Sequence, residues 1–432
     1  MTFSTRNLID NASLTRLQYL TILICFLMNM LDGMDVMIIS YASTAIIKDW
    51  QISPAAMGLV FSAGLLGMTF GALFLTPIAD QAGRKTLIII SALLMGSTIY
   101  ATSWVNSIPK LIMLRFLSGV GIGSMLASTA ALMAEYAPTR LKDFLVSTVI
   151  GGYPVGAVLS GLAASQIIPT LGWQTMFQLA GMITLASVPL IVFFLSESLD
   201  FYIKRRPANA LAKVNRILAR MNFGAIDQLP PAPPKQHKIA VKGLMGKEFL
   251  VPTIQLWIAL FLAFATLYFL TSWIPSLAQS TGLSTKLAIY AGIVFNAGAF
   301  FGIITQGYFS NKYGLKKTIG IFLILTGVLM AVFKVFLGSD MVFWVFCALG
   351  FGIQGGFVGL YAVAALMYPT EFRTTGVGAS IGIGRLGGIV GPAIGGVLIG
   401  MGFSISTNFL IYAIPTILAG VMTMFISSKE IS

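Results

Sequence analysis

The chain consists mainly of long apolar runs, each about twenty residues long and therefore long enough to cross a bilayer as a helix. Only 9% of its 432 residues are charged, against about a quarter in an ordinary soluble domain. A water-soluble fold could not cover its surface with so few charges. The first run is longer than a signal-peptide core and carries two aspartates, so we interpret it as a retained span. We therefore expect an all-α integral membrane protein.

Charged and turn-rich breaks divide the chain into twelve expected transmembrane helices. The longest break, residues 196–250, is basic and contains a cluster of four prolines. We expect it to be a cytoplasmic linker between two six-helix bundles, residues 1–195 and 251–432. The expected spans are 18–40, 57–79, 86–104, 109–132, 144–168, 174–195, 251–275, 287–309, 317–337, 341–367, 376–400 and 405–427.

The basic residues indicate how these helices are oriented, because cytoplasmic loops carry an excess of Lys and Arg. Of the 27 Lys and Arg residues, 21 lie in the N-terminus and every second loop after it. Three lie in the alternate loops and three inside spans. We therefore expect both termini in the cytoplasm and the chain in a bacterial inner membrane. The net charge of +13 is then a topology signal and not a nucleic-acid footprint.

The two halves of the sequence come into register when one is shifted by 231 residues. The loop DQAGRK at 80–85 then aligns with NKYGLK at 311–316, and Pro138-Thr139 aligns with Pro369-Thr370. Several glycines match at the same offset. We interpret this as a duplicated six-helix unit, which predicts two pseudo-symmetric bundles with a substrate site between them near the membrane midplane.

Two motifs resemble those of the major facilitator superfamily. Residues 76–85, TPIADQAGRK, resemble the signature loop between its spans 2 and 3, although Thr76 and Gln81 depart from the usual residues. Arg115, followed by glycines at 119, 121 and 123, is similar to its span-4 motif. The resemblance covers nearly the whole chain and implies the major facilitator fold.

A narrower resemblance is to the aromatic acid:proton symporter branch of that superfamily. Residues 31–35, LDGMD, resemble its paired-aspartate signature, and AEYAP at 134–138 and GIGRLG at 382–387 look like the same branch. The resemblance implies import, with protons, of carboxylates such as benzoate, hydroxybenzoates, protocatechuate or muconate. Some members use a histidine for function, whereas the only histidine here is His237 in the central loop.

Few ionisable side chains lie inside the expected spans, where each costs on the order of 3 kcal/mol and usually faces a cavity or a partner. Lys334 lies near the end of span 9, where snorkelling explains it. Asp32 and Asp35 are three residues apart and share a helix face. Two such carboxylates resist ionising together, which suits the pair to proton coupling. Alternatively, the pair caps or packs against a neighbouring helix.

Two arginines complete this set. Arg385 lies too deep in span 11 to reach an interface, and its planar guanidinium suits a carboxylate. We expect it to bind the substrate anion; the alternative is an ion pair with Asp32 or Asp35. Arg115, in the outer part of span 4, is expected to pair with these aspartates or with substrate.

Polar residues at the cytoplasmic helix ends form an expected gate. They would latch helix ends while the inward side is closed and release them during the conformational switch. Positive-inside bias is the alternative for Arg84 and Lys85, but it does not explain Asp80. The expected gate residues are Asp80, Gly83, Arg84, Lys85, Glu135, Arg140, Glu371 and Arg373.

Aromatic and polar residues near the expected site are candidates for substrate contacts. Aromatic rings can stack on an aromatic substrate, and amides can hydrogen-bond it, but both are also ordinary helix packing. The candidates are Tyr153, Asn296, Gln354 and Tyr361.

The predicted function is secondary import of a small organic carboxylate, aromatic or aromatic-derived, by proton symport. A carboxylate entering a negative-inside cell is opposed by about 2.3 kcal/mol per charge per 100 mV, and one co-moving proton cancels this term. The alternative is an exporter of drugs or metabolites, a proton antiporter on the same fold.

Other classes of protein fit the sequence poorly. No GxxxxGK[ST] phosphate loop occurs, and Cys25 and Cys347 lie in no metal-ligand spacing. We therefore expect no enzyme, metal or cofactor, and a monomer whose partners are the organic anion, protons and the lipid bilayer.

Overall fold

The computed structural model describes residues 9–10, 13–230, 246, 249–339 and 341–426, without the side chains of Asp80, Asp143, Thr370, Glu371, Phe372 and Thr374. All regular structure in this part of the chain is helical. The elements are α2 (Arg16–Trp50), α3 (Pro54–Phe70), η1 (Gly71–Leu75), α4 (Thr76–Ala82), α5 (Arg84–Thr102), α6 (Ile108–Tyr136), η2 (Thr139–Leu141), α7 (Lys142–Ile150), α8 (Gly152–Phe194), α9 (Leu199–Arg205), α10 (Ala210–Arg220), α11 (Leu250–Ser280), α12 (Thr285–Tyr313), α13 (Leu315–Ala331), η4 (Phe333–Phe336), α14 (Val342–Met367), α15 (Thr370–Gly400) and α16 (Ile405–Met424).

The helices of the described chain make twelve passes. Ten segments are long and apolar enough to cross a membrane. One of them, Phe144–Phe194, contains two passes, because Gly172 has φ 84° and ψ 163° and the chain reverses there. α13 adds the last pass with 17 residues. The expectation of an all-α fold with twelve transmembrane helices is confirmed.

Polar residues fix where several helices begin. The residue before the first turn is a Ser or Thr whose side chain accepts a hydrogen bond from a backbone N–H of that turn, which satisfies a donor that the helix cannot pair itself. Pro54 then follows Ser53 at the first position of α3, where its missing N–H costs nothing. The capping residues are Thr15, Ser53, Ser284 and Ser404.

Glycines hold the helices of each half together. At these positions an added Cβ atom would overlap a backbone carbonyl of the neighbouring helix, so only glycine permits the approach. The same contacts recur in the other half at the 231-residue offset that the sequence predicts. The matched contacts are Gly67–Phe116 with Gly298–Cys347, Gly71–Val120 with Gly302–Phe351, and Gly156–Met30 with Gly387–Phe261.

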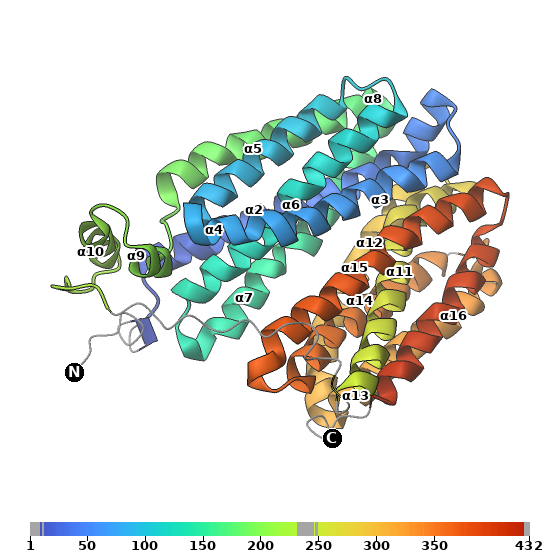
Figure 1. Cartoon of the computed structure of the whole chain (residues 1–432). Helices are drawn as coiled ribbons and strands as arrows, with labels where there is room; N and C mark the ends of the chain where they lie inside the picture. The colour runs from blue at the N-terminus through green and yellow to red at the C-terminus, as the bar shows by residue number, and fades with distance from the viewer. Residues whose placement is uncertain (1–8, 11–12, 231–245, 247–248, 340, 427–432) are drawn as a thin grey trace.

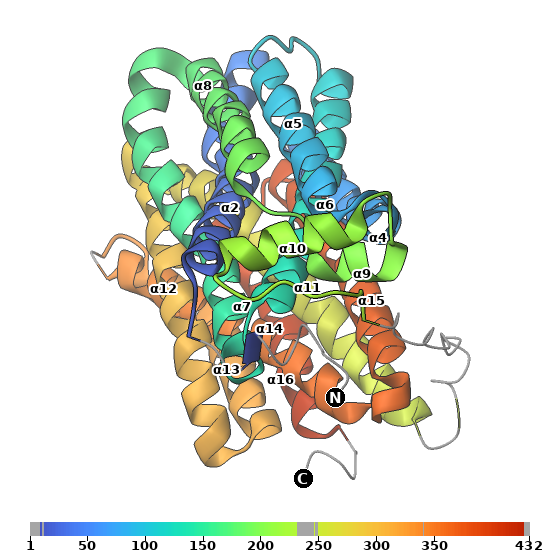
Figure 2. The same ribbon diagram turned by 90° about the vertical axis from the view of Figure 1, so that its left-hand side faces the viewer.

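The two halves form separate bundles that meet at one end (Figure 1). α2–α8 make the first bundle and α11–α16 the second, with α9 and α10 lying across the end of the first bundle (Figure 2). We call the end that carries α9, α10, the start of α2 and the end of α16 the basic end. Towards this end the two bundles diverge in Figure 1.

The opposite end, which we call the closed end, joins the bundles. Ser62 of α3 donates to the carbonyl of Ile389 on α15 at 2.6 Å. Ser40 of α2 donates to the carbonyls of Thr271 and Ser272 on α11, both at 2.8 Å. Nearer the basic end, Gly382 on α15 has no atom within 4 Å of the place where a Cβ would lie. The structure is therefore closed at one end and open at the other.

The glycine contacts generate a stability prediction. Gly156→Ala and Gly387→Ala should each lower the thermal midpoint of the detergent-solubilised protein, because overpacking costs about 1–3 kcal/mol. Gly378→Ala is the matched control, since its Cβ would meet open space. Equal midpoints for all three variants would contradict the close backbone contacts.

Candidate functional site

One of the two aspartates on α2 is fully paired. Asp35 is 0% exposed and Arg115 of α6 is 4% exposed, and Arg115 Nη1 lies 2.8 Å from Asp35 Oδ1. The Ser118 hydroxyl, one turn further along α6, donates to Asp35 Oδ2. Arg115 also donates to Thr102 Oγ1 at 3.4 Å and lies 5.5 Å from the ring centroid of Phe177. The expected pairing of Arg115 with a span-1 aspartate is therefore present, and it involves Asp35.

The other aspartate is buried without a partner. Asp32 is 1% exposed, and neither of its carboxylate oxygens has a hydrogen-bond partner within the described residues. Gly33 beside it lies directly against the backbone of Tyr153 on α8, which closes the helix pair around the carboxylate. A buried charge without a partner is costly. Asp32 is thus the electrostatically uncompensated member of the pair.

Arg385 on α15 is the matching uncompensated cation. It is partly exposed and has no ion pair or hydrogen bond to any described residue. The alternative of an ion pair with Asp32 or Asp35 is therefore wrong for this conformation. Gly384, the residue before Arg385, faces the ring of Phe264. Gly388, one turn along α15, faces the Tyr268 ring.

Four aromatic rings gather beside Arg385. Phe264 and Tyr268 of α11 stack with centroids 5.9 Å apart and planes 20° apart. Phe357 of α14 meets Phe264 edge-on at 4.6 Å, and Tyr361 meets Phe357 at 5.1 Å. Such edge-on and offset pairs are the favoured aromatic arrangements. We call these four residues the aromatic cluster.

A cavity next to the aromatic cluster separates the two bundles. It is partly open to solvent and is lined by residues of both bundles. Tyr153 lines it from the first bundle, and Tyr268, Asn296, Gln354 and Phe357 line it from the second. The Asn296 amide donates to the Gly292 carbonyl at 2.9 Å, so part of its hydrogen-bonding capacity is used within its own helix. Three of the four predicted substrate contacts thus share one cavity.

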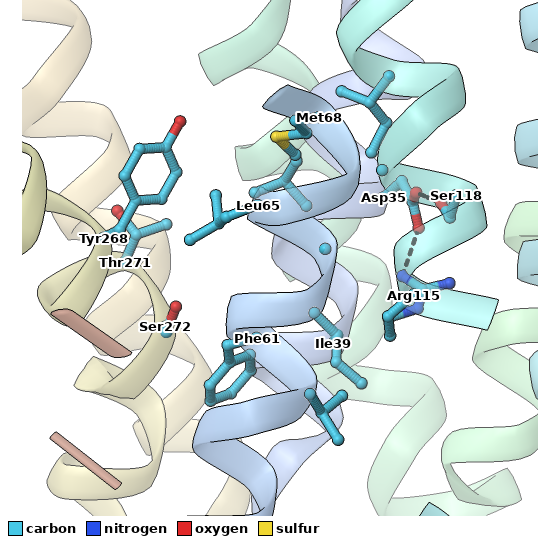
Figure 3. Close-up of a pocket in the computed structure, with 15 residues that line it drawn as sticks. Asp35, Ile39, Phe61, Leu65, Met68, Arg115, Ser118, Tyr268, Thr271 and Ser272 are labelled. Atoms are coloured by element: carbon cyan, nitrogen blue, oxygen red, sulfur yellow. Dashed lines mark hydrogen bonds and ion pairs between the residues drawn. The ribbon is translucent and has the colours of Figure 1, made fainter. Parts of the chain in front are cut away.

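A second cavity of about 420 Å³ reaches the Asp35–Arg115 pair (Figure 3). Asp35, Arg115 and Ser118 lie on one side of it, and Tyr268 lies on the other. Tyr268 lines both cavities. It therefore lies between the paired acid and the space beside Arg385.

The expected gate residues lie at the basic end, and those with described contacts bond within the first bundle or to the start of the linker. Arg84 Nε lies 2.9 Å from Glu135 Oε1, and Ser198 also donates to Glu135. Glu197 accepts the backbone N–H of Lys85 at 3.1 Å and lies against Gly83, which has φ 98°.

Two further gate residues lie at the surface: the side chains of Arg140 and Arg373 are exposed. The side chains of Asp80 and Glu371, and the whole of His237, lie outside the described residues.

Sequence reasoning missed three residues of this arrangement. Ser118 follows Arg115 by one helical turn, a spacing that could have identified it. Glu197 lies in the linker that we treated only as a basic segment. Tyr268 is one of many aromatics in an apolar run, and no local pattern separates it from lipid-facing rings.

Twelve membrane helices in two bundles, with uncompensated charges and cavities between them, define a solute transporter. Residues 25–308 and 256–431 match the family model of the Major Facilitator Superfamily. The chain therefore belongs to the Major Facilitator Superfamily.

Similar proteins agree with this assignment. The 4-hydroxybenzoate transporter PcaK of Acinetobacter baylyi is 31% identical, with 98% of this chain and 93% of that protein covered. The gallate transporter of Pseudomonas putida is 32% identical over 95% of this chain and 92% of its own length. These relatives are transporters, not enzymes, and they confirm the resemblance to the aromatic-acid branch.

A solved structure shows the same fold. The inward open conformation of the xylose transporter XylE from E. coli has a TM-score of 0.75 at 14% identity, covering 96% of this chain and 97% of that one. At this identity the likeness concerns the fold alone.

The buried ion pair generates a second stability prediction. Arg115→Gln should lower the thermal midpoint strongly, because removing one partner of a buried pair costs about 3–5 kcal/mol. Adding Asp35→Asn should restore part of the loss, since the uncompensated charge is then removed. Arg140→Gln, an exposed arginine, is the control and should leave the midpoint unchanged. A double variant no more stable than Arg115→Gln would contradict this account.

Proposed function

We propose that the protein imports a small aromatic carboxylate with protons across a bacterial inner membrane. The observation that carries the proposal is Arg385, a guanidinium inside a membrane helix beside the aromatic cluster that has no ion pair with any residue the structure describes. Keeping a cation unpaired there is costly, so an anion is its expected partner. The neighbouring rings can pack on an aromatic body while the guanidinium binds the carboxylate in a bidentate manner. The named substrates of the relatives, 4-hydroxybenzoate and gallate, have this chemistry.

The cavity residues would then select among aromatic acids. Tyr153, Asn296 and Gln354 line the space beside the aromatic cluster and carry the polar groups able to bond ring hydroxyls. Tyr361 adds a phenol from within the aromatic cluster. Tyr268 contributes the ring that borders both cavities.

The two aspartates would have different roles. Asp35 is paired with Arg115 and bonded by Ser118, so both of its carboxylate oxygens already have partners. Asp32 has no such compensation, and its protonated form avoids the cost of an unpaired buried charge. We assign Asp32 as the proton carrier. Arg115 holds Asp35, the second carboxylate of the pair, in place.

Transport would proceed by rocking of residues 1–195 against 251–432, joined by the linker 196–250. The basic end faces the cytoplasm by the charge rule, so the described conformation opens inward. When it closes, the gate residues of the first bundle would meet the second bundle, and their present contacts with Glu135 and Glu197 would loosen. We propose that a monomer carries out this cycle.

An uptake screen tests the function. Full-length protein in liposomes should accumulate at least one of benzoate, 4-hydroxybenzoate, gallate or muconate when an inward proton gradient is imposed, and a protonophore should abolish the accumulation. Uptake unchanged by the protonophore would rule out symport. Transport of none of these acids would rule out the substrate class.

Arg385 is the sharpest single test of the substrate site. Arg385→Ala should weaken carboxylate binding by about 10- to 100-fold, the loss of a hydrogen bond to a charged group. Arg385→Lys should recover only part, because it lacks the planar fork. Lys334→Ala, an exposed cation remote from the cavity, should behave as wild type. An Arg385→Ala variant that loses carboxylate uptake yet exports cations would favour the drug-exporter alternative.

Asp32 tests proton coupling. Asp32→Asn should abolish accumulation driven by the proton gradient, because the carrier can no longer exchange a proton. Exchange of labelled for unlabelled substrate across the membrane should persist, since it needs no net proton movement. Gradient-driven accumulation by Asp32→Asn at the wild-type level would contradict the assignment. Unlike Asp32→Asn, Asp35→Asn should also lower the thermal midpoint, because it removes the ion-pair partner of Arg115.

A further inference from the structure

An apolar groove runs along the outside of the second bundle, away from the transport cavities. It has about 1000 Å³ of empty space between α12, α13 and α14. The stacked rings of Phe322 and Phe351, 5.2 Å apart, form part of its lining, and Ile321 and Leu325 are 48% and 62% exposed beside it. The groove lining comprises Phe309, Tyr313, Thr318, Ile321, Phe322, Leu325, Thr326, Leu329, Ala348, Phe351 and Gly352.

Both threonine hydroxyls of the groove lining are already hydrogen-bonded. The hydroxyl of Thr318 donates to the Gly314 carbonyl at 2.9 Å, and that of Thr326 donates to the Phe322 carbonyl at 2.7 Å. Both bonds stay within α13. These two side chains therefore leave no unmet hydrogen bond for a polar ligand. The groove suits a hydrocarbon chain.

The groove has the length and position of one membrane leaflet. From Thr318 to Leu329 the helix rises about 16 Å, close to half of the bilayer's hydrocarbon thickness, about 15 Å. It begins at the basic end, where α12 ends and α13 starts. An acyl chain entering there would run towards the membrane midplane.

Two lysines stand at the mouth of the groove. Lys312 is exposed, with its Nζ 5.2 Å from the ring centroid of Tyr313. Lys317 is exposed and precedes Ile321 by one helical turn, on the groove side of α13. No ion pair joins either lysine to a described acidic residue. The third lysine, Lys316, already donates to the Ile426 carbonyl at 3.1 Å.

This cationic mouth belongs to the second bundle alone. At the 231-residue offset, Gln81 and Thr86 stand where the second bundle has Lys312 and Lys317. In the same way Leu117 stands where the groove has the smaller Ala348. The duplication therefore does not account for either the two cations or the space between the helices.

We propose that this groove binds an anionic phospholipid, with one acyl chain between α12, α13 and α14 and the phosphate at Lys312 and Lys317. Each lysine close to the membrane surface raises the affinity for an anionic headgroup about fivefold. The apolar lining supplies the chain contact, and the lysines supply selectivity for negative charge. The site is separate from the substrate cavity and independent of the proposed transport function.

The test measures lipid binding to the full chain in neutral detergent. Phosphatidylglycerol and phosphatidylcholine with identical acyl chains are titrated, and bound lipid is counted by native mass spectrometry. Wild type should prefer phosphatidylglycerol. Lys312→Gln/Lys317→Gln should lower phosphatidylglycerol affinity by about 25-fold and leave phosphatidylcholine affinity unchanged. Lys204→Gln/Lys213→Gln, two exposed cations on α9 and α10, is the control for net charge and should keep the preference.

The groove itself is tested by filling it. Ala348→Phe, which places a larger side chain in the groove, should reduce binding of both lipids. Ile183→Phe, at an exposed position of α8 outside the groove, should not. The proposal is overturned if wild type binds the two lipids equally, or if both lysine double variants lose the same affinity. It is equally overturned if Ala348→Phe binds both lipids as wild type does.

Discussion

Close contact between glycine and the backbone of a neighbouring helix is the constraint on which this structure depends. Gly156 lies against Met30 and Gly387 against Phe261, at the same offset in the two halves. Inside a membrane no hydrophobic force drives helices together, so packing at small residues must supply the association. Each half is thereby a tightly joined bundle. The surface between the bundles carries the two cavities.

The charges at that surface fall into two kinds. Arg115 and Asp35 compensate each other, and Ser118 completes the bonding of the carboxylate. Asp32 and Arg385 are left without partners among the described residues. A compensated pair is a fixed structural element, whereas an uncompensated group favours whatever neutralises it. The structure thus separates the groups that hold the site from those available to a proton and an anion.

Duplication explains the frame of the protein but not its specialised parts. The glycine contacts repeat in both halves, whereas Asp32 and Asp35 occur in the first half and Arg385 in the second. The groove mouth at Lys312 and Lys317 also belongs to one half. Function in such a protein resides where the repeats differ, because a symmetric unit would place the same chemistry on both sides of the pseudo-twofold axis.

Sequence alone determined the twelve helices, the repeat and the short list of intramembrane charges, because hydrophobic length, a constant offset and the cost of buried charge are local properties. It also placed Arg84 and Glu135 in the same expected gate. Only the tertiary structure decided that Arg115 pairs with Asp35 and not Asp32, that Arg385 stays unpaired, and that Tyr268 borders both cavities. Those facts depend on the rotation and depth of helices from different parts of the chain, which packing between them sets and no local pattern records.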